Sequence, residues 1–293
     1  MIAADFDYAR PSSLREALGL LERPGAVPLA GGQSLLPLLA DRSVVADLLV
    51  DIGRLAELRR VARDRDWLVI GAGATLAAVM TAEAAKPVPL LAEALRSVGS
   101  AAIRNRGTLV GNLVSASPNS ELSVAMVALD ARFVLRHRTG DREVAAADFF
   151  LGPHRTVLTA GELVTELRIA SPTASRALGG FAEVSVRAGA PPLCCVAVVL
   201  AVDETAAITD VRVAAGGITG APARWHEAEA ALRGHPLSEN VARLAQCGEP
   251  SLVLSLDLPE AAYARDVLPV LTRRAVAAAA TRFIPNPQPG IQP

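Results

Sequence analysis

Residues 103–121 read Ile103-Arg-Asn-Arg-Gly-Thr-Leu-Val-Gly-Asn-Leu-Val-Ser-Ala-Ser-Pro-Asn-Ser-Glu121. The segment is too polar and too rich in glycine for a protein core, and its apolar residues follow neither a helical nor a strand period. Glycine lets backbone N–H groups approach a bulky anionic ligand, because it has no Cβ. Hydroxyl and amide side chains can bind phosphate and sugar oxygens, and here they belong to Thr108, Asn112, Ser115, Ser117, Asn119 and Ser120. The segment therefore predicts a nucleotide-binding loop.

A second segment upstream, Ala30-Gly-Gly-Gln-Ser-Leu-Leu-Pro-Leu-Leu39, has the same character. It follows a short apolar strand and runs into the start of a leucine-rich helix, where free N–H groups and the helix dipole favour an anion. It matches neither common phosphate loop, because no lysine follows the glycines and no third glycine stands at the dinucleotide spacing. Alone, Gly31-Gly32 favours a plain tight turn. Both segments in one domain favour a shared ligand.

Length and composition narrow the class of protein. A chain of 293 residues has room for about two domains, and its 51% hydrophobic content excludes a disordered protein. A formal net charge of −1 argues against a nucleic-acid partner and against a polybasic membrane surface. The composition therefore favours a globular protein that binds neither nucleic acid nor a membrane surface.

The sequence shows no targeting or metal-binding pattern. Acidic residues occupy the N-terminus where a signal peptide carries positive charge, and no apolar run is long enough to span a membrane. We therefore expect a cytoplasmic protein without a membrane span. Cys194, Cys195 and Cys247 lack metal-ligand spacing, and the four histidines are scattered, so we expect buried reduced thiols and no metal site.

The order of short strands and helices predicts an α+β protein with two domains. The first would cover residues 1–172, in two lobes of about 1–55 and 56–172. It includes a helix ending near Leu21 and capped by Ser12 or Ser13, and a strand hairpin with its tip at residues 63–66. A helix over residues 122–129, capped by Asn119 or Ser120, would follow the second loop. Phe149 and Phe150 are expected to pack in the core.

The domain boundary is expected where the hydrophobic period is lost, at residues 171–177. A small α+β domain over residues 173–284 would then begin with a three-stranded antiparallel sheet and continue with helices, and residues 285–293 would form a flexible tail. Gly179-Gly180 and Asp203-Glu204 are expected as turns. The expected strands are 181–187, 194–202 and 208–214, and the expected helices are 225–233, 241–247 and 261–283.

Together these segments make the chain resemble the flavin-binding subunit of the molybdenum hydroxylases. That family includes the medium subunit of aerobic carbon monoxide dehydrogenase and the flavin domain of xanthine dehydrogenase. The resemblance covers nearly the whole chain. Its motifs are Ala30-Gly-Gly-Gln-Ser34, Arg104-Asn-Arg-Gly-Thr108, Gly111-Asn112, Ala116-Ser-Pro118 with Glu121, Asp148-Phe-Phe150, Thr156-Val-Leu158, Glu162-Leu163, Gly216-Gly217 and Glu227-Ala228.

The resemblance implies a two-lobed FAD-binding domain of the p-cresol methylhydroxylase type, with FAD between the lobes and its pyrophosphate on the two loops. It gives the first loop as Ala30, Gly31, Gly32, Gln33, Ser34 and Leu35, and the second as Thr108, Gly111, Asn112 and Ser115, with Ser117 and Glu121 nearby. Glu121 is either an acceptor for FAD hydroxyls or an acid that stabilises a helix N-terminus.

The sequence departs from the family pattern in three places. Val110 stands where many relatives have a second glycine. Ser115 and Ser117 replace the His and Asp that carbon monoxide dehydrogenases usually carry, which places the chain nearer to xanthine dehydrogenase. Residues 186–193 contain one arginine and no aromatic residue, whereas relatives often have paired arginines and an aromatic over the flavin ring.

The resemblance implies an oxidoreductase subunit that passes electrons from the iron–sulfur clusters of a partner, through FAD, to NAD or another acceptor. Its partners would be a molybdopterin-binding large subunit and a small subunit with two-iron two-sulfur clusters. Such a subunit needs no Ser-His-Asp triad or catalytic carboxylate dyad, and the sequence offers none. Two alternatives stay open, namely an FAD-free assembly protein with the same fold and a stand-alone flavin oxidoreductase.

Overall fold

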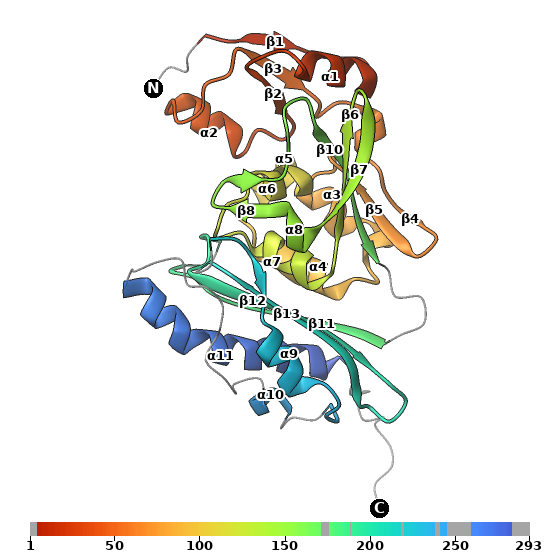
Figure 1. The fold of residues 1–293 in the computed structure, drawn as a ribbon, viewed down its shortest axis with the longest axis vertical. Helices are drawn as coiled ribbons and strands as arrows, with labels where there is room; N and C mark the ends of the chain where they lie inside the picture. Colours follow the sequence, from red (N-terminus) through yellow and green to blue (C-terminus); the bar gives the residue numbers. More distant parts are fainter. Residues whose placement is uncertain are drawn as a thin grey trace, which may run out of the picture.

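The computed structural model describes residues 5–170, 176–187, 189–217, 220–237, 241–244 and 259–282. Its strands form sheets of three, five and four strands and one two-stranded hairpin. Figure 1 shows the three-stranded sheet at one end of the long axis and the four-stranded sheet toward the other, with helices and the five-stranded sheet between them. This arrangement confirms the predicted α+β class.

The three-stranded sheet is parallel, and its strand order is β1-β3-β2, with β1 Asp7–Ala9, β2 Ala26–Leu29 and β3 Leu48–Asp51. Helix α1, Leu14–Leu21, begins at Ser13, whose Oγ accepts a hydrogen bond from the Glu16 N–H at 3.2 Å. Of the two predicted capping residues, Ser12 and Ser13, it is therefore Ser13 that caps this helix. The apolar face of α1 lies in one cluster with Leu48 and Val50 of β3, which joins the helix to this sheet.

The five-stranded sheet is antiparallel and has the order β4-β5-β10-β6-β7. Its strands are β4 Val61–Asp64, β5 Trp67–Gly71, β6 Arg132–His137, β7 Gly140–Ala145 and β10 Leu163–Ala170. The β4–β5 pairing confirms the hairpin tip predicted at residues 63–66. Phe133 and Phe149 stack with ring centroids 3.9 Å apart, and Phe150 meets both rings edge-on, so both phenylalanines are core residues as predicted.

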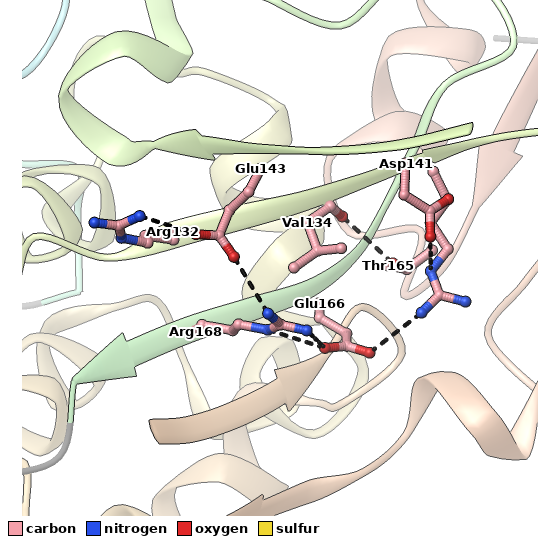
Figure 2. Close-up of polar contacts among 8 residues, drawn as sticks. Arg132, Val134, Asp141, Glu143, Thr165, Glu166 and Arg168 are labelled. Carbon is pink, nitrogen blue, oxygen red and sulfur yellow. Dashed lines mark hydrogen bonds and ion pairs between the residues drawn. The ribbon is translucent and has the colours of Figure 1, made fainter. Parts of the chain in front are cut away.

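One face of this sheet carries a ladder of ion pairs across β6, β7 and β10 (Figure 2). Charges alternate along it, with N–O distances of 3.0 to 3.7 Å, in the order Arg132, Glu143, Arg168, Glu166, Arg136 and Asp141. Pairs this exposed contribute little singly. The opposite face of the sheet packs against the core, and it fully buries Phe133, Leu135, Leu167 and Ile169.

The predicted nucleotide loop is more regular than its sequence suggests. It contains helix α5, Ala101–Arg106, and helix α6, Leu109–Val114, and Leu109, Val110 and Leu113 are buried. The prediction that this segment lacks helical structure and lies outside the core was therefore wrong. Helices of six residues are too short to establish a period, and Gly111 interrupts the pattern further.

The C-terminal sheet is antiparallel with strands β11 Arg176–Val184, β12 Cys194–Val202, β13 Ile208–Gly216 and β14 Ala223–Arg224. The three predicted strands are present, and the two-residue β14 adds a fourth. Alternate residues of β12 belong to two different cores. Cys195 and Ala197 belong to the core of α4, Pro89–Ser97, and α7, Glu121–Ala128. Cys194 belongs to the core of α9, His226–Leu232, and α11, Pro259–Thr281. Figure 1 shows helices on both faces of this sheet.

Gly179 and Gly180 lie inside β11, so the predicted turn there was wrong. A Cβ on Gly179 would stand 2.7 Å from Leu90 Cβ of α4, and one on Gly180 would stand 1.9 Å from the Ala275 carbonyl oxygen of α11. Each glycine therefore lets a helix approach β11 closely, from opposite sides of the strand. Glycine pairs in sequence suggest turns, whereas here they permit packing.

Helices α9, His226–Leu232, α10, Val241–Leu244, and α11, Pro259–Thr281, correspond to the three predicted helices. Residues 171–175 at the predicted boundary, Cys247 and the predicted tail lie outside the described residues. The domain and lobe divisions stay predictions. Cys194 and Cys195 are buried free thiols. Within the described ranges, no helix is both long and apolar enough to cross a membrane.

We expect Gly180→Ala to lower the free energy of unfolding by about 3 kcal/mol, because the new Cβ would overlap the backbone of α11. Gly140→Ala is the matched control, since a Cβ there meets nothing within 4 Å. Urea unfolding of both variants measures the difference. Equal stability of the two would contradict the close packing of α11 on β11.

Candidate functional site

A cavity of about 360 Å³ lies between the two predicted loops, within the size range of small-molecule sites. The first loop contributes the wall from Ala30 to Leu35, at the junction of β2 with helix α2, Leu35–Ala40. The second loop contributes residues 107, 108, 110–112, 114 and 115. Ile52 directly after β3, Leu76 of helix α3, Leu76–Thr81, and Val98 directly after α4 also line the cavity, as do Leu163 and Val164 of β10. All of these residues are apolar.

The first wall is a tight turn with unused polar groups. Gly32 has φ +72°, a conformation that favours glycine, and its carbonyl accepts a hydrogen bond from the Leu36 N–H at 3.1 Å. Ser34 stands at the N-cap of α2, yet its hydroxyl makes no capping hydrogen bond. The Gln33 amide donates to the Gly31 carbonyl at 3.3 Å. The Ser34 hydroxyl is therefore available to a ligand in the cavity.

The two walls touch each other through backbone atoms. A Cβ on Gly31 would lie 2.2 Å from the Arg106 carbonyl oxygen and 2.8 Å from Gly107 Cα. Real Cβ atoms do not approach backbone so closely, so the loops can meet only because residue 31 is glycine. The contact of Gly31 with this backbone thus fixes how far apart the two loops lie at one side of the cavity.

The second wall is anchored to the segment after β5. The Leu76 N–H donates to the Gly107 carbonyl at 2.9 Å, and the Leu109 N–H donates to the Ala74 carbonyl at 3.2 Å. Thr108 is buried and caps α6 by accepting a hydrogen bond from the Gly111 N–H at 3.1 Å. Its capping role explains why a threonine precedes this helix.

The end of the second wall is held from two sides. The Ser115 hydroxyl donates to the Asn112 carbonyl at 2.6 Å, and the Ser120 hydroxyl donates to Asn112 Oδ1 at 3.0 Å. The backbone N–H of His154 donates to the Ala116 carbonyl at 2.8 Å. The imidazole Nδ1 of the same residue lies 3.0 Å from the Ser115 carbonyl oxygen. Ala116 has φ +44° while being buried, so the surrounding contacts hold a strained backbone there.

Ten of the twelve residues predicted to bind the cofactor line this cavity. They are Ala30, Gly31, Gly32, Gln33, Ser34, Leu35, Thr108, Gly111, Asn112 and Ser115. Ser117 and Glu121 do not line it. Val110, the first departure from the family pattern noted above, also lines the cavity and is almost fully buried.

Glu121 instead begins α7 and is buried against the C-terminal sheet. Burial, together with a smaller contribution from the nearby Glu183 of β11, raises the pKa of its carboxyl to about 7. Burial also raises the pKa of Glu183. Two acids from different parts of the chain therefore meet at this packing surface, and near neutral pH a substantial fraction of Glu121 is uncharged.

Glu162 is a lining residue that sequence reasoning did not select, although it belongs to one of the motifs of the resemblance. Arg142 donates to its two carboxylate oxygens at 2.6 and 2.8 Å. These hydrogen bonds, first among several causes, lower the pKa of Glu162 to about 2, so it stays ionised. It is the only charged residue among those that line the cavity. Only the fold brings Arg142 to it, across 20 residues of sequence.

The cavity can bind but has no means of covalent catalysis. Its polar groups are two serine hydroxyls, a threonine hydroxyl, two amides and one carboxylate held by an arginine. No histidine or cysteine lines it. In the described part of the chain no group of His, Cys, Asp and Glu is arranged to hold a metal ion. Such a site suits a cofactor that carries its own chemistry.

Fold and site thus define a cofactor-binding α+β protein, and comparisons with known families give the family. Residues 4–172 match the family described as "FAD binding domain in molybdopterin dehydrogenase", and residues 180–279 match "CO dehydrogenase flavoprotein C-terminal domain". The chain belongs to this family of molybdenum hydroxylase flavoprotein subunits. The expected FAD cofactor and oxidoreductase class are confirmed at this level.

Individual relatives cover almost the whole chain. The glyceraldehyde dehydrogenase medium chain of Sulfolobus acidocaldarius is 34% identical over 94% of this chain and 98% of its own length. The nicotine 6-hydroxylase medium subunit of Paenarthrobacter nicotinovorans is 35% identical over 94% and 97%. The solved structure of reconstituted CO dehydrogenase from Oligotropha carboxidovorans superposes with a TM-score of 0.90 at 28% identity, covering 96% of this chain and 100% of that chain. Substrates differ among these relatives while the fold persists.

We expect the stability of the FAD-free protein to fall as the pH rises from about 4.5 to about 7, because folded Glu121 keeps a proton that the unfolded chain has released. Glu121→Gln mimics the protonated form. It should therefore match the wild type near pH 4 and be more stable by about 3 kcal/mol at pH 8. Urea unfolding at both pH values measures this. A wild type no more sensitive to pH than the variant would contradict the burial of Glu121 as an acid.

Proposed function

We propose that the chain holds FAD in the cavity between its two loops and passes electrons from the iron–sulfur clusters of a partner subunit to NAD or another acceptor. The observation that carries this proposal is the direct contact of Gly31 with the backbone of Arg106 and Gly107. It brings two glycine-containing loops, 75 residues apart, to the same cavity. That is the arrangement a dinucleotide with a central pyrophosphate requires.

The lining residues fit FAD. Glycines at 31, 32, 107 and 111 leave backbone accessible, which suits phosphate oxygens, and the neighbouring hydroxyls and amides suit ribose and ribityl groups. Apolar residues such as Leu38, Leu76 and Val98 suit the ring systems. We assign the ten lining residues named above to FAD contacts. Ser117 and Glu121 would act only near one end of the ligand, beyond the residues that line the cavity.

Bound FAD would supply the electron-transfer chemistry. This chain's residues position it, exclude water with apolar walls and stabilise its charges. Since no histidine or cysteine lines the cavity and Arg142 holds its one carboxylate, we assign oxidation of the organic substrate to another subunit. The names of the relatives, such as "medium chain" and "medium subunit", support a role within a multi-subunit enzyme. The partners would be a molybdopterin-binding large subunit and a small subunit with two-iron two-sulfur clusters.

We expect the purified chain to bind FAD, with flavin absorption that is released on denaturation. Gly31→Ala should weaken FAD binding by about tenfold or more, because the added Cβ forces the two loops apart. Gly19→Ala, where a Cβ on α1 meets nothing within 4 Å, should leave it unchanged. Titration of the FAD-free proteins with FAD measures both affinities.

Co-purification with products of neighbouring genes tests the electron-transfer role. Recovery of iron–sulfur and molybdenum subunits with this chain would support it. A protein that takes up no FAD even with its partners would instead favour the assembly-protein alternative. Oxidation of a substrate by the isolated chain would favour the stand-alone oxidoreductase.

A further inference from the structure

Asn112 lines the cavity, and a side-chain amide can present either an oxygen acceptor or two N–H donors to a ligand. If the N–H donors face the ligand, they bind an acceptor atom of the ligand, whereas the amide oxygen would bind a donor. Ser120, eight residues further along the chain, contacts this amide, and its hydroxyl oxygen lies 3.0 Å from Asn112 Oδ1. Ser120 itself does not line the cavity.

The hydrogen bonds around Ser120 fix the direction of this contact. Ser120 caps α7, and its oxygen accepts a hydrogen bond from the Ser123 N–H at 3.2 Å. Its single O–H must therefore donate elsewhere, and Asn112 Oδ1 is its acceptor. With the amide turned round, the hydroxyl hydrogen would lose this acceptor while buried, since Ser120 is only 4% exposed. Buried donors without acceptors are strongly disfavoured.

The Asn112 N–H donors are consequently turned away from Ser120, and within the described residues they meet no acceptor. We propose that Ser120 is a positioning residue, which holds the Asn112 amide so that it presents N–H donors to an acceptor oxygen of the ligand. This inference rests on the proposed function, in which the ligand is FAD. It assigns a specific role to a residue outside the cavity.

The structure also links this arrangement to the packing of the C-terminal sheet. The Gly217 N–H at the end of β13 donates to the Pro118 carbonyl at 3.0 Å, and the Ser120 N–H donates to the Ser117 carbonyl at 3.2 Å. The segment that carries Ser120 is thus held by the second predicted domain on one side and by Asn112 on the other. The position of Asn112 is therefore linked, through Ser120, to the end of β13.

The test is a double-mutant cycle on FAD affinity, measured by quenching of flavin fluorescence in FAD-free protein. We expect Ser120→Ala to weaken binding by about fivefold and Asn112→Ala by about tenfold. Because Ser120 acts through Asn112, the double variant should bind no more weakly than Asn112→Ala alone. Additive losses, or a Ser120→Ala affinity within about twofold of wild type, would overturn the proposal.

Ser13→Ala is the matched control, because Ser13 caps the eight-residue helix α1 as Ser120 caps the eight-residue helix α7. Both variants should lower the melting temperature, since each loses a cap, but only Ser120→Ala should weaken FAD binding. Equal weakening by both would show a general effect of lost stability and would also overturn the proposal.

Ser120→Gly guards against a variant that fails to fold, because glycine at a cap costs the helix little while removing the hydroxyl. It should show the same loss of affinity as Ser120→Ala, and wild-type affinity in this variant would contradict the role of the hydroxyl. A wild-type protein that binds no FAD would refute the proposed function itself, which separates the two failures.

Discussion

The contact between Gly31 and the backbone of Arg106 and Gly107 is the constraint on which the rest of the site depends. It joins the first loop, at the edge of a parallel sheet, to the second, which lies among the helices that cover the antiparallel sheet. Any side chain at residue 31 would separate these loops and widen the cavity. The hydrogen bonds of Gly107 and Leu109 to the segment after β5 then hold the second loop in place.

Glycines act in the same way where the C-terminal sheet packs. Gly179 and Gly180 bring α4 and α11 against β11, and Gly216 brings β13 against Val124 of α7. Because β12 buries residues on both faces, its sequence is a continuous apolar run without alternation. The sheet is thus shared between two cores. Its position fixes Glu121 and Glu183 at the surface where they meet.

Polar groups around the cavity are held mainly by hydrogen bonds from just outside it. Arg142 holds Glu162, Ser120 holds Asn112, and His154 holds the backbone of Ser115 and Ala116. Precise binding sites need such supporting residues, because an unsupported amide or carboxylate can rotate. These supporting residues lie in β7, at the N-cap of α7, and in the hairpin of β8, Phe150–Gly152, and β9, Arg155–Thr156.

The sequence by itself determined the two loops, the α+β class and every polar lining residue except Glu162. Glycines and small polar side chains at short spacing have few other uses, and their order along the chain is specific. It also predicted α1, the β4–β5 hairpin and the three long C-terminal strands, because their apolar periods are local. Only the tertiary structure decided that α5 and α6 are helices, that Gly179-Gly180 lies within a strand, and that Glu121 is buried away from the cavity lining. These features depend on which distant parts of the chain pack against each segment, and a local sequence pattern does not contain this information.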